Sequence, residues 1–320
     1  MEGESNHARH TVTRREMLHF LVAGALAAFS AGYTRFGFAA EDSNFRAIYL
    51  DPRLRQQFFL FLENVFHLYP EQDFHDLIAR ITRATLTDRE IYEAVLAELP
   101  SIKPFLRQVR YALPALRKQK EIMCDQTLAL LEGRKRFDRY AEIGSTGRYF
   151  DRLSHKLDFA EPPVFVHSDK PSYQPRDIVE RGRLSKVGSF LPLAAYEPLA
   201  LPESGIDLLT VYIGFHHAPP ERRDAFIRSC HKVLKRDGSL IVRDHDAVDA
   251  SMVHLVALAH DVFNCGLELP WSTNAAEIRN FTSLQQLQES LETMGFRPHG
   301  RRLLQDGDPT LNTLMRFDKV

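Results

Sequence analysis

Short apolar runs alternate with helical stretches from Arg139 to the end of the chain, and this alternation restricts the fold more than any other feature. The runs that have the length of strands are residues 140–143, 164–167, 184–187, 206–213, 239–243, 298–304 and 311–317. A helix between two strands carries the chain back to the same edge of a sheet, so such strands pair in parallel. The last two runs are joined by a turn sequence at residues 306–309, which predicts an antiparallel hairpin at the sheet edge. The pattern therefore predicts an α/β fold with a seven-stranded, mostly parallel sheet.

Residues 41–135 show the pattern of helices instead. Apolar side chains recur there at spacings of three and four, as at Leu54, Phe58 and Phe61. Thr87 begins a capping box, and Gly133 marks a helix end. We therefore expect three parts: residues 1–40, an all-helical segment at 41–135, and the α/β domain at 136–320.

The first forty residues resemble a bacterial twin-arginine export signal. Arg14 and Arg15 precede an apolar run, and residues 37–39 offer small side chains for cleavage. The segment predicts either export or inner-membrane anchoring, with membrane association through residues 14–40. If the run is instead a buried or interfacial helix, the protein is cytoplasmic.

The composition excludes some classes of partner. The 320 residues carry a formal net charge of −1, so no overall field attracts nucleic acid. Cys124, Cys230 and Cys265 are too few and too scattered for a disulfide framework or a zinc site.

A glycine turn follows the first predicted strand, where residues 142–147 read EIGSTG. Glycine lets the backbone turn tightly and approach a ligand closely. The helix that follows presents N–H groups that suit a polar ligand. Taken alone, the turn is equally compatible with a plain strand-to-helix connection.

Two further motifs follow in a characteristic order. Residues 201–209 read LPESGIDLL, residues 212–220 read YIGFHHAPP, and residues 228–242 read RSCHKVLKRDGSLIV. Together with the acid and glycines of residues 142–147, they resemble the motifs of class I methyltransferases, which use S-adenosylmethionine (SAM). The resemblance covers about Arg139 to Val320 and implies a Rossmann-like methyltransferase sheet with SAM as cofactor.

The resemblance also implies roles for particular residues. Glu142 would bind the amino-acid end of SAM, while Gly144, Ser145 and Gly147 would form the loop that passes close to it. Ser145 and Thr146 stand where the family has a third glycine, which departs from its pattern. Asp169, with His167 or Ser168 as alternatives, would bind the ribose hydroxyls. Tyr212, at the end of the fourth strand, is a further candidate for the cofactor site.

Methyl transfer requires mainly alignment of the two reactants, with a base if the acceptor is a hydroxyl or an amine. The candidates for this base are His216, His217, Asp244 and His245, which follow two neighbouring strands. The carboxyl ends of parallel strands form the crevice in which doubly wound sheets bind ligands. These side chains are therefore expected to line the acceptor site.

No metal ion is expected in this crevice. His254 and His260 are six residues apart, so they do not share a helix face. We expect His260 and Asp261 to line or brace a polar substrate crevice. Residues 261–274, with Trp271, are expected to form a lid over the acceptor.

Three functions are consistent with fold and motifs. The first is methyl transfer from SAM to an unidentified acceptor, and the second is binding or scaffolding by a methyltransferase fold without catalysis. An NAD-dependent oxidoreductase is disfavoured, because residues 212–220 and 228–242 match the methyltransferase pattern instead.

Overall fold

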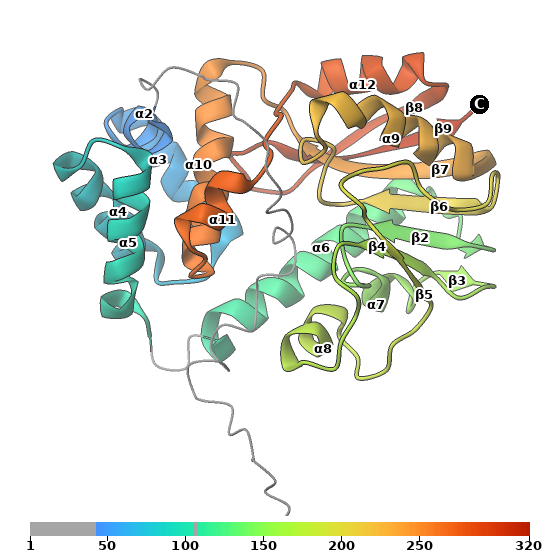
Figure 1. The fold of residues 1–320 in the computed structure, drawn as a ribbon, viewed down its shortest axis with the longest axis horizontal. Coiled ribbons are helices and arrows are strands. Elements are labelled where there is room, and N and C mark those ends of the chain that lie inside the picture. Colours follow the sequence, from blue (N-terminus) through green and yellow to red (C-terminus); the bar gives the residue numbers. More distant parts are fainter. Residues whose placement is uncertain (1–42, 105–107) are drawn as a thin grey trace, which may run out of the picture.

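The computed structural model describes residues 43–104 and 108–320, which form a helical part and an α/β part lying side by side (Figure 1). The twin-arginine-like segment lies outside these residues, so its role stays a prediction. Within the two described ranges, no helix is both long and apolar enough to cross a membrane.

The sheet has seven strands in the order β5-β4-β2-β6-β7-β9-β8. Their bounds are Tyr140–Ile143 (β2), Val164–His167 (β4), Ser189–Pro192 (β5), Ile206–Val211 (β6), Leu234–His245 (β7), Phe296–Leu304 (β8) and Asn312–Lys319 (β9). The first five pair in parallel, whereas β9 runs antiparallel to both β7 and β8. This arrangement confirms the predicted seven-stranded, mostly parallel sheet with a terminal antiparallel hairpin. A small parallel pair, Arg136–Phe137 (β1) and Asp158–Phe159 (β3), lies beside it.

One predicted strand was wrong. Residues 184–187 form the connection after Gly182, which ends α8 (Pro175–Arg181) in the left-handed region. Leu184 is 68% exposed, so the apolar side chain that suggested a strand lies in solvent. The true strand begins at Ser189, whose N–H donates to the carbonyl of Pro163. A short apolar run alone does not distinguish a strand from a connection.

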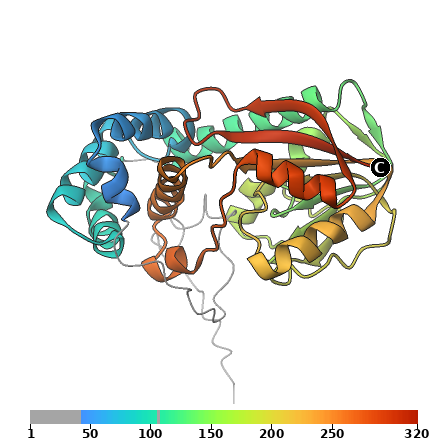
Figure 2. The same cartoon turned by 90° about the horizontal axis from the view of Figure 1, so that it is seen from above.

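Helices cover both faces of the sheet (Figure 2). On one face lie α9 (Pro220–Val233) and α12 (Leu284–Thr293), which pack on Ala141, Leu209 and Leu240. On the other lie α6 (Leu113–Leu130) and α7 (Phe150–Leu153), which pack on Tyr140 and Leu208. Successive residues of a strand point to opposite faces, which is why Tyr140 and Ala141 enter different cores.

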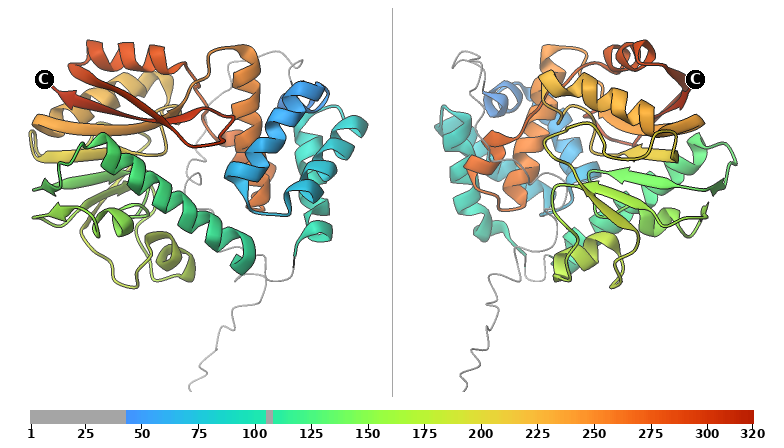
Figure 3. Two further views of the ribbon diagram at one scale, coloured as in Figure 1. Left: turned by 180° about the vertical axis from the view of Figure 1, so that it is seen from behind. Right: turned by 45° about the vertical axis from the view of Figure 1, so that its right-hand side comes forward.

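The helical part combines helices that precede the sheet in the sequence with α10, which follows β7 (Figure 3). Its first elements are α2 (Asn44–Tyr49), α3 (Pro52–Phe61), the π-helical turn Leu62–Phe66, α4 (Glu71–Ala84) and α5 (Asp88–Ile102). They share one core with α10 (Ala250–Gly266), through residues such as Leu255, Leu258 and Val262. A second π-helical turn, Gln108–Ala112, leads into α6, which packs on the sheet rather than on this core. Packing therefore crosses the expected boundary at residue 135 in both directions.

Two capping boxes are present among residues 43–104 and 108–320. The one at Thr87 and Glu90 is confirmed. The one before α12 uses Ser283 and Gln286.

The expected lid over residues 261–274 was wrong. Residues 261–266 are the last turns of the buried helix α10, and α11 (Trp271–Ala276) follows directly. Trp271 packs edge-on against Tyr92 of α5, with ring centroids 5.3 Å apart. The segment is therefore part of the helical core, because its apolar side chains find partners there.

Gly266 provides a test of this core. A Cβ at this position would overlap the ring of Phe66, so Gly266→Ala should lower the free energy of unfolding by about 1–3 kcal/mol, despite a gain of about 1 kcal/mol in helix propensity. Urea unfolding measures the change. Adding Phe66→Leu should recover part of the loss, because it removes the ring atoms that the methyl group meets. Equal stability of Gly266→Ala and the wild type would contradict this packing.

Candidate functional site

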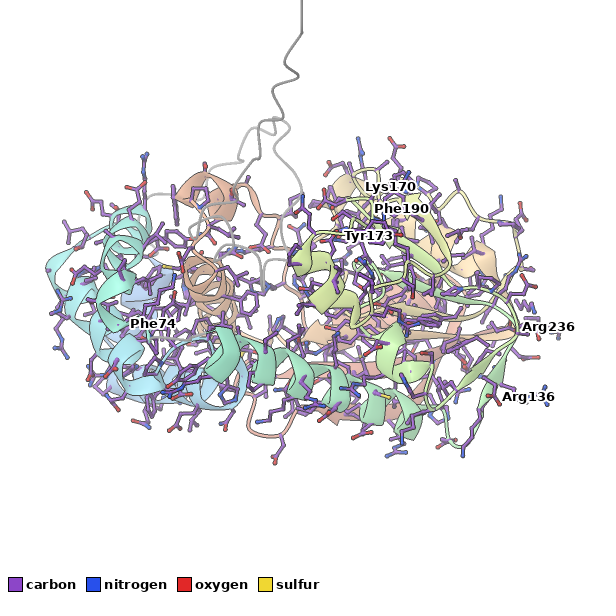
Figure 4. All side chains as sticks on the ribbon, turned by 90° about the horizontal axis from the view of Figure 1, so that it is seen from below. Phe74, Arg136, Lys170, Tyr173, Phe190 and Arg236 are labelled. Atoms are coloured by element: carbon purple, nitrogen blue, oxygen red, sulfur yellow. The ribbon has the colours of Figure 1, made fainter. Side chains whose placement is uncertain are left out.

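The candidate site residues lie at the carboxyl ends of β2, β4, β6 and β7, which form one edge of the sheet. This edge faces the helical part. Figure 4 shows Lys170 and Tyr173, which follow β4, between the helical part that contains Phe74 and the far end of the sheet with Arg136 and Arg236. The fold therefore brings the predicted glycine turn and the predicted base candidates to the same edge.

The glycine turn has the backbone conformation that glycine permits. Gly144 and Gly147 have φ of 90° and 101°, in the left-handed region. A Cβ on Gly144 would lie 2.5 Å from Ile213 Cδ1, and one on Gly147 would lie 2.9 Å from Phe165 Cζ. Both glycines are therefore required by the chain's own packing, since Ile213 and Phe165 lie directly against the turn.

Glu142 stabilises this turn through hydrogen bonds to its side-chain carboxylate. Its carboxylate accepts hydrogen bonds from the Tyr140 and Ser145 hydroxyls and from the N–H groups of Tyr149 (3.2 Å) and Phe150 (3.0 Å). The side chain is fully buried, and burial raises its pKa despite these four donors. Ser145 Oγ in turn accepts from the N–H groups of Gly147 and Arg148. The donors at the start of the next helix are thus used within the chain, and the cofactor role of Glu142 stays a prediction.

Asp169 and Tyr212 lie in different surroundings. Asp169 is exposed after β4, with its backbone N–H donating to His167 Nδ1 at 3.0 Å. Tyr212 is buried, with its hydroxyl 2.8 Å from Thr127 Oγ1 and its ring packed on Tyr149. A small hollow of about 10 Å³ lies beside the turn; its lining includes Thr146, Gly147, Phe165, Pro171 and Lys186.

The base candidates are brought together. His216 Nδ1 lies 2.6 Å from Asp244 Oδ1, and both side chains are buried. Asp244 also accepts the backbone N–H groups of Phe215 and His245, each at 2.9 Å. These donors favour the ionised carboxylate, although burial raises its pKa. Asp244 therefore orients His216 and fixes the proton on its Nδ1.

Three further imidazoles surround this pair. The ring centroids of His216 lie 4.1 Å from His217, 5.4 Å from His245 and 5.3 Å from His260. His260 belongs to α10, so the cluster joins the sheet edge to the helical part. Phe281 packs against three of the rings, at 5.1 Å from His216, 5.9 Å from His245 and 5.2 Å from His260.

Burial keeps these imidazoles neutral at neutral pH. It lowers the pKa of His217, lowers those of His216 and His260 well below the ordinary value, and lowers that of His245 to about 4. Neutral imidazole carries an unprotonated nitrogen, so each ring can accept a proton or bind a metal ion.

A buried polar network that the sequence did not reveal surrounds the cluster. Arg279 donates to Asp261 (2.7 Å), Glu277 (2.7 Å) and Asn274 (2.7 Å). Glu277 Oε1 lies 3.6 Å from His217 Nδ1. Arg279 follows α11 in a segment without regular structure, so no periodic pattern marked it. In the sequence its only signal was the charged pair Glu277 and Arg279, just after the expected lid.

No family model matches the sequence, and neither does any curated protein. Among solved structures, a Burkholderia thailandensis 1,6-didemethyltoxoflavin-N1-methyltransferase with bound S-adenosylhomocysteine is 16% identical (74% of this chain, 92% of that chain, TM-score 0.43). A possible exported protein from Bordetella parapertussis is 15% identical (86% and 95%, TM-score 0.44). A possible histamine N-methyltransferase from Thermotoga maritima is 17% identical (63% and 91%, TM-score 0.41).

A buried lysine lies behind the glycine turn. Lys120 Nζ donates to the carbonyl of Val179 at 3.3 Å, near the buried ion pair of Arg148 and Glu180. Burial lowers the pKa of Lys120 to about 8. The unfolded chain therefore keeps this proton between pH 8 and about 10.4 while the folded chain loses it, so this group's contribution to stability rises with pH across that window.

Replacing Lys120 should remove its contribution to the pH dependence of stability. Lys120→Met removes the buried charge, so its unfolding free energy relative to wild type should fall by about 1–3 kcal/mol between pH 7.5 and pH 10. Urea unfolding of both proteins at each pH measures the difference, and other titrations cancel because both proteins share them. A difference that does not change with pH would show that Lys120 titrates normally.

Proposed function

We propose that this chain is a SAM-dependent methyltransferase whose acceptor lies against the histidines at the ends of β6 and β7. One observation carries the proposal: the sheet order places the glycine turn after its first strand at the same edge as His216, His217 and Asp244. The left-handed Gly144 and Gly147 and the exposed Asp169 fit a cofactor laid across this turn.

The chain's own residues would do the following. The sulfonium of SAM supplies a methyl group with a good leaving group, so the protein mainly aligns the acceptor and excludes water. His216 has the features of a base, because its Nδ1–H is held by Asp244 and its Nε2 is free of hydrogen bonds from the described residues. Phe281 packs against the His216 ring with centroids 5.1 Å apart and helps to exclude water from it.

A second candidate function is binding or scaffolding without SAM. It is favoured by the four donors that already occupy Glu142 and by the contact of Ile213 and Phe165 with the glycine turn. In that case the turn serves folding alone.

Calorimetric titration of SAM and of S-adenosylhomocysteine into the full chain separates the two candidates. We expect binding with a dissociation constant on the order of micromolar, which corresponds to about −8 kcal/mol. Ile213 is partly exposed at the turn, so Ile213→Phe should weaken binding at least tenfold by filling the cofactor's space, while Ile213→Val should not. No heat with either ligand in the folded wild type would rule out the methyltransferase proposal and leave the second candidate.

Asp169 tests the orientation of the cofactor. Because its side chain is exposed, Asp169→Ala should leave stability unchanged and weaken SAM binding about tenfold, the loss of a hydrogen bond to a charged group. Asp158→Ala, a change at another exposed acid, on β3, is the matched control and should bind as wild type. If both variants bind equally well, the ribose does not lie on the loop after β4.

A further inference from the structure

Three of the clustered histidines present nitrogen atoms to one point. One ring nitrogen from each of His216, His217 and His260 lies within 4.8 Å of the others. Three nitrogens bound to one zinc ion at about 2.0–2.1 Å are roughly 3.3 Å apart in tetrahedral geometry. Small rotations of the rings therefore suffice to bring the three nitrogens into a common coordination sphere.

In each of the three rings, Nδ1 already has a partner. Nδ1 of His216 contacts Asp244 at 2.6 Å, Nδ1 of His217 contacts the Ile278 carbonyl at 3.2 Å, and Nδ1 of His260 contacts the Val256 carbonyl at 2.9 Å. Each Nδ1 thus carries its proton, and each Nε2 is left with a lone pair. Histidines that bind metal ions are typically held in this way, by a carboxylate or a backbone carbonyl on the opposite nitrogen.

The Nε2 of His216 lacks the partner that burial normally requires. It is buried, and no group in the part of the chain that the structure describes forms a hydrogen bond with it. A buried, unsatisfied polar atom costs about 1–3 kcal/mol. A cation at the convergence point would remove this cost.

The surrounding charges also suit a cation. Asp244 contacts His216, Glu277 lies 3.6 Å from His217, and Asp261 follows His260 on α10. Arg279 pairs with Asp261 and Glu277, so it offsets only part of these three carboxylates. Arg243 is a second guanidinium near His216, and it lies 4.0 Å from Asp308. Four carboxylates therefore stand against two guanidiniums, and the net charge near the histidines is negative.

We propose that His216, His217 and His260 bind one divalent transition-metal ion, of the kind that imidazole prefers, such as Zn²⁺. Asp244 and the carbonyls of Val256 and Ile278 hold the three rings in place. The ion takes the Nε2 lone pair of His216, so in the metal-bound chain this histidine is a ligand and not the base of the proposed methyl transfer. A tetrahedral ion with three protein ligands keeps one position for water or for an oxygen or nitrogen of a bound molecule. The site links the sheet edge to α10, so it also ties the two parts of the molecule together.

Two other histidines are excluded by their contacts, although they are close in sequence or space. His245 contacts the Thr310 carbonyl with Nδ1 (3.0 Å) and Asn312 with Nε2 (3.3 Å), so both of its nitrogens are used. His254, on the same helix as His260, contacts Asn44 instead. The expectation that no metal is present came from comparing His254 with His260, whereas the ligands come from two different segments.

The test uses the untagged full chain after dialysis against a chelator. Added Co²⁺ should bind at one ion per chain and develop the visible absorption of a tetrahedral site, and Zn²⁺ should displace it. Metal analysis after gel filtration should give one Zn²⁺ per chain. Absence of stoichiometric binding in the folded chain would overturn the proposal.

Variants then locate the ion. His216→Gln, His217→Gln and His260→Gln should each abolish the Co²⁺ spectrum, while Asp244→Asn should weaken binding about 10–100-fold. His245→Gln and His254→Gln are the matched controls and should still bind one ion. Binding that persists in His260→Gln, or that is lost in His254→Gln, would contradict the assignment.

One measurement needs no variant and no SAM. X-ray absorption of the Zn²⁺-loaded wild-type chain should show nitrogen neighbours with imidazole scattering at about 2.0–2.1 Å. Sulfur ligation, or oxygen neighbours alone, would overturn the proposal even if ligand variants fail to fold. Because the metal is added without SAM, failure of the metal site and failure of methyl transfer remain separate results.

Discussion

The buried guanidinium of Arg279 connects α10, α11 and the segment after α11, and the candidate site depends on how these elements pack. Its partners are Asp261 of α10, Asn274 of α11 and Glu277, and Asp261 in turn accepts a hydrogen bond from Asn44 of α2. Burial alone would lower the pKa of Arg279, but Asp261 and Glu277 raise it, so the group stays charged. A buried charge that loses its partners is strongly destabilising, so replacing any single member of this network should lower the stability of the fold. As a result, the network fixes the positions of α2 and α10 relative to the carboxyl ends of the strands.

This arrangement gives the histidines their chemistry. Because α10 closes over the ends of β6 and β7, His216, His217, His245 and His260 are removed from water and kept neutral. Neutral imidazoles with one nitrogen held by Asp244 or a carbonyl can accept a proton or bind a metal ion. The glycine turn at Gly144 lies at the same edge, two strand ends away from Asp244. A cofactor on the turn and an acceptor against the histidines would therefore meet there.

Much of the sheet could be predicted from the sequence, because its central strands are apolar on both faces and end at recognisable turns. Residues 140–143 and 164–167 were placed with the bounds that the structure has. The strand predicted at 184–187 was wrong because Leu184 is apolar yet exposed, and the sequence pattern does not distinguish it from a buried residue. The lid predicted at 261–274 was wrong because Trp271 packs on Tyr92 of α5. His216, His217, Asp244 and His245 were predicted to meet, since they follow neighbouring parallel strands. His260 was expected to line or brace this crevice, but its contacts with His216 and His217 could not be derived, and neither could the role of Arg279. Both depend on how α10 and the segment after α11 dock, and local periodicity carries no such information.

The central claim is that the glycine turn and the histidine cluster form two halves of one site. A crystal structure of the full chain with S-adenosylhomocysteine tests it most directly. The account predicts that the ligand lies over Gly144 and Gly147, with its ribose near Asp169 and its sulfur directed toward His216. A ligand bound elsewhere, or a turn left closed by Ile213 and Phe165 at saturating ligand concentration, would contradict it.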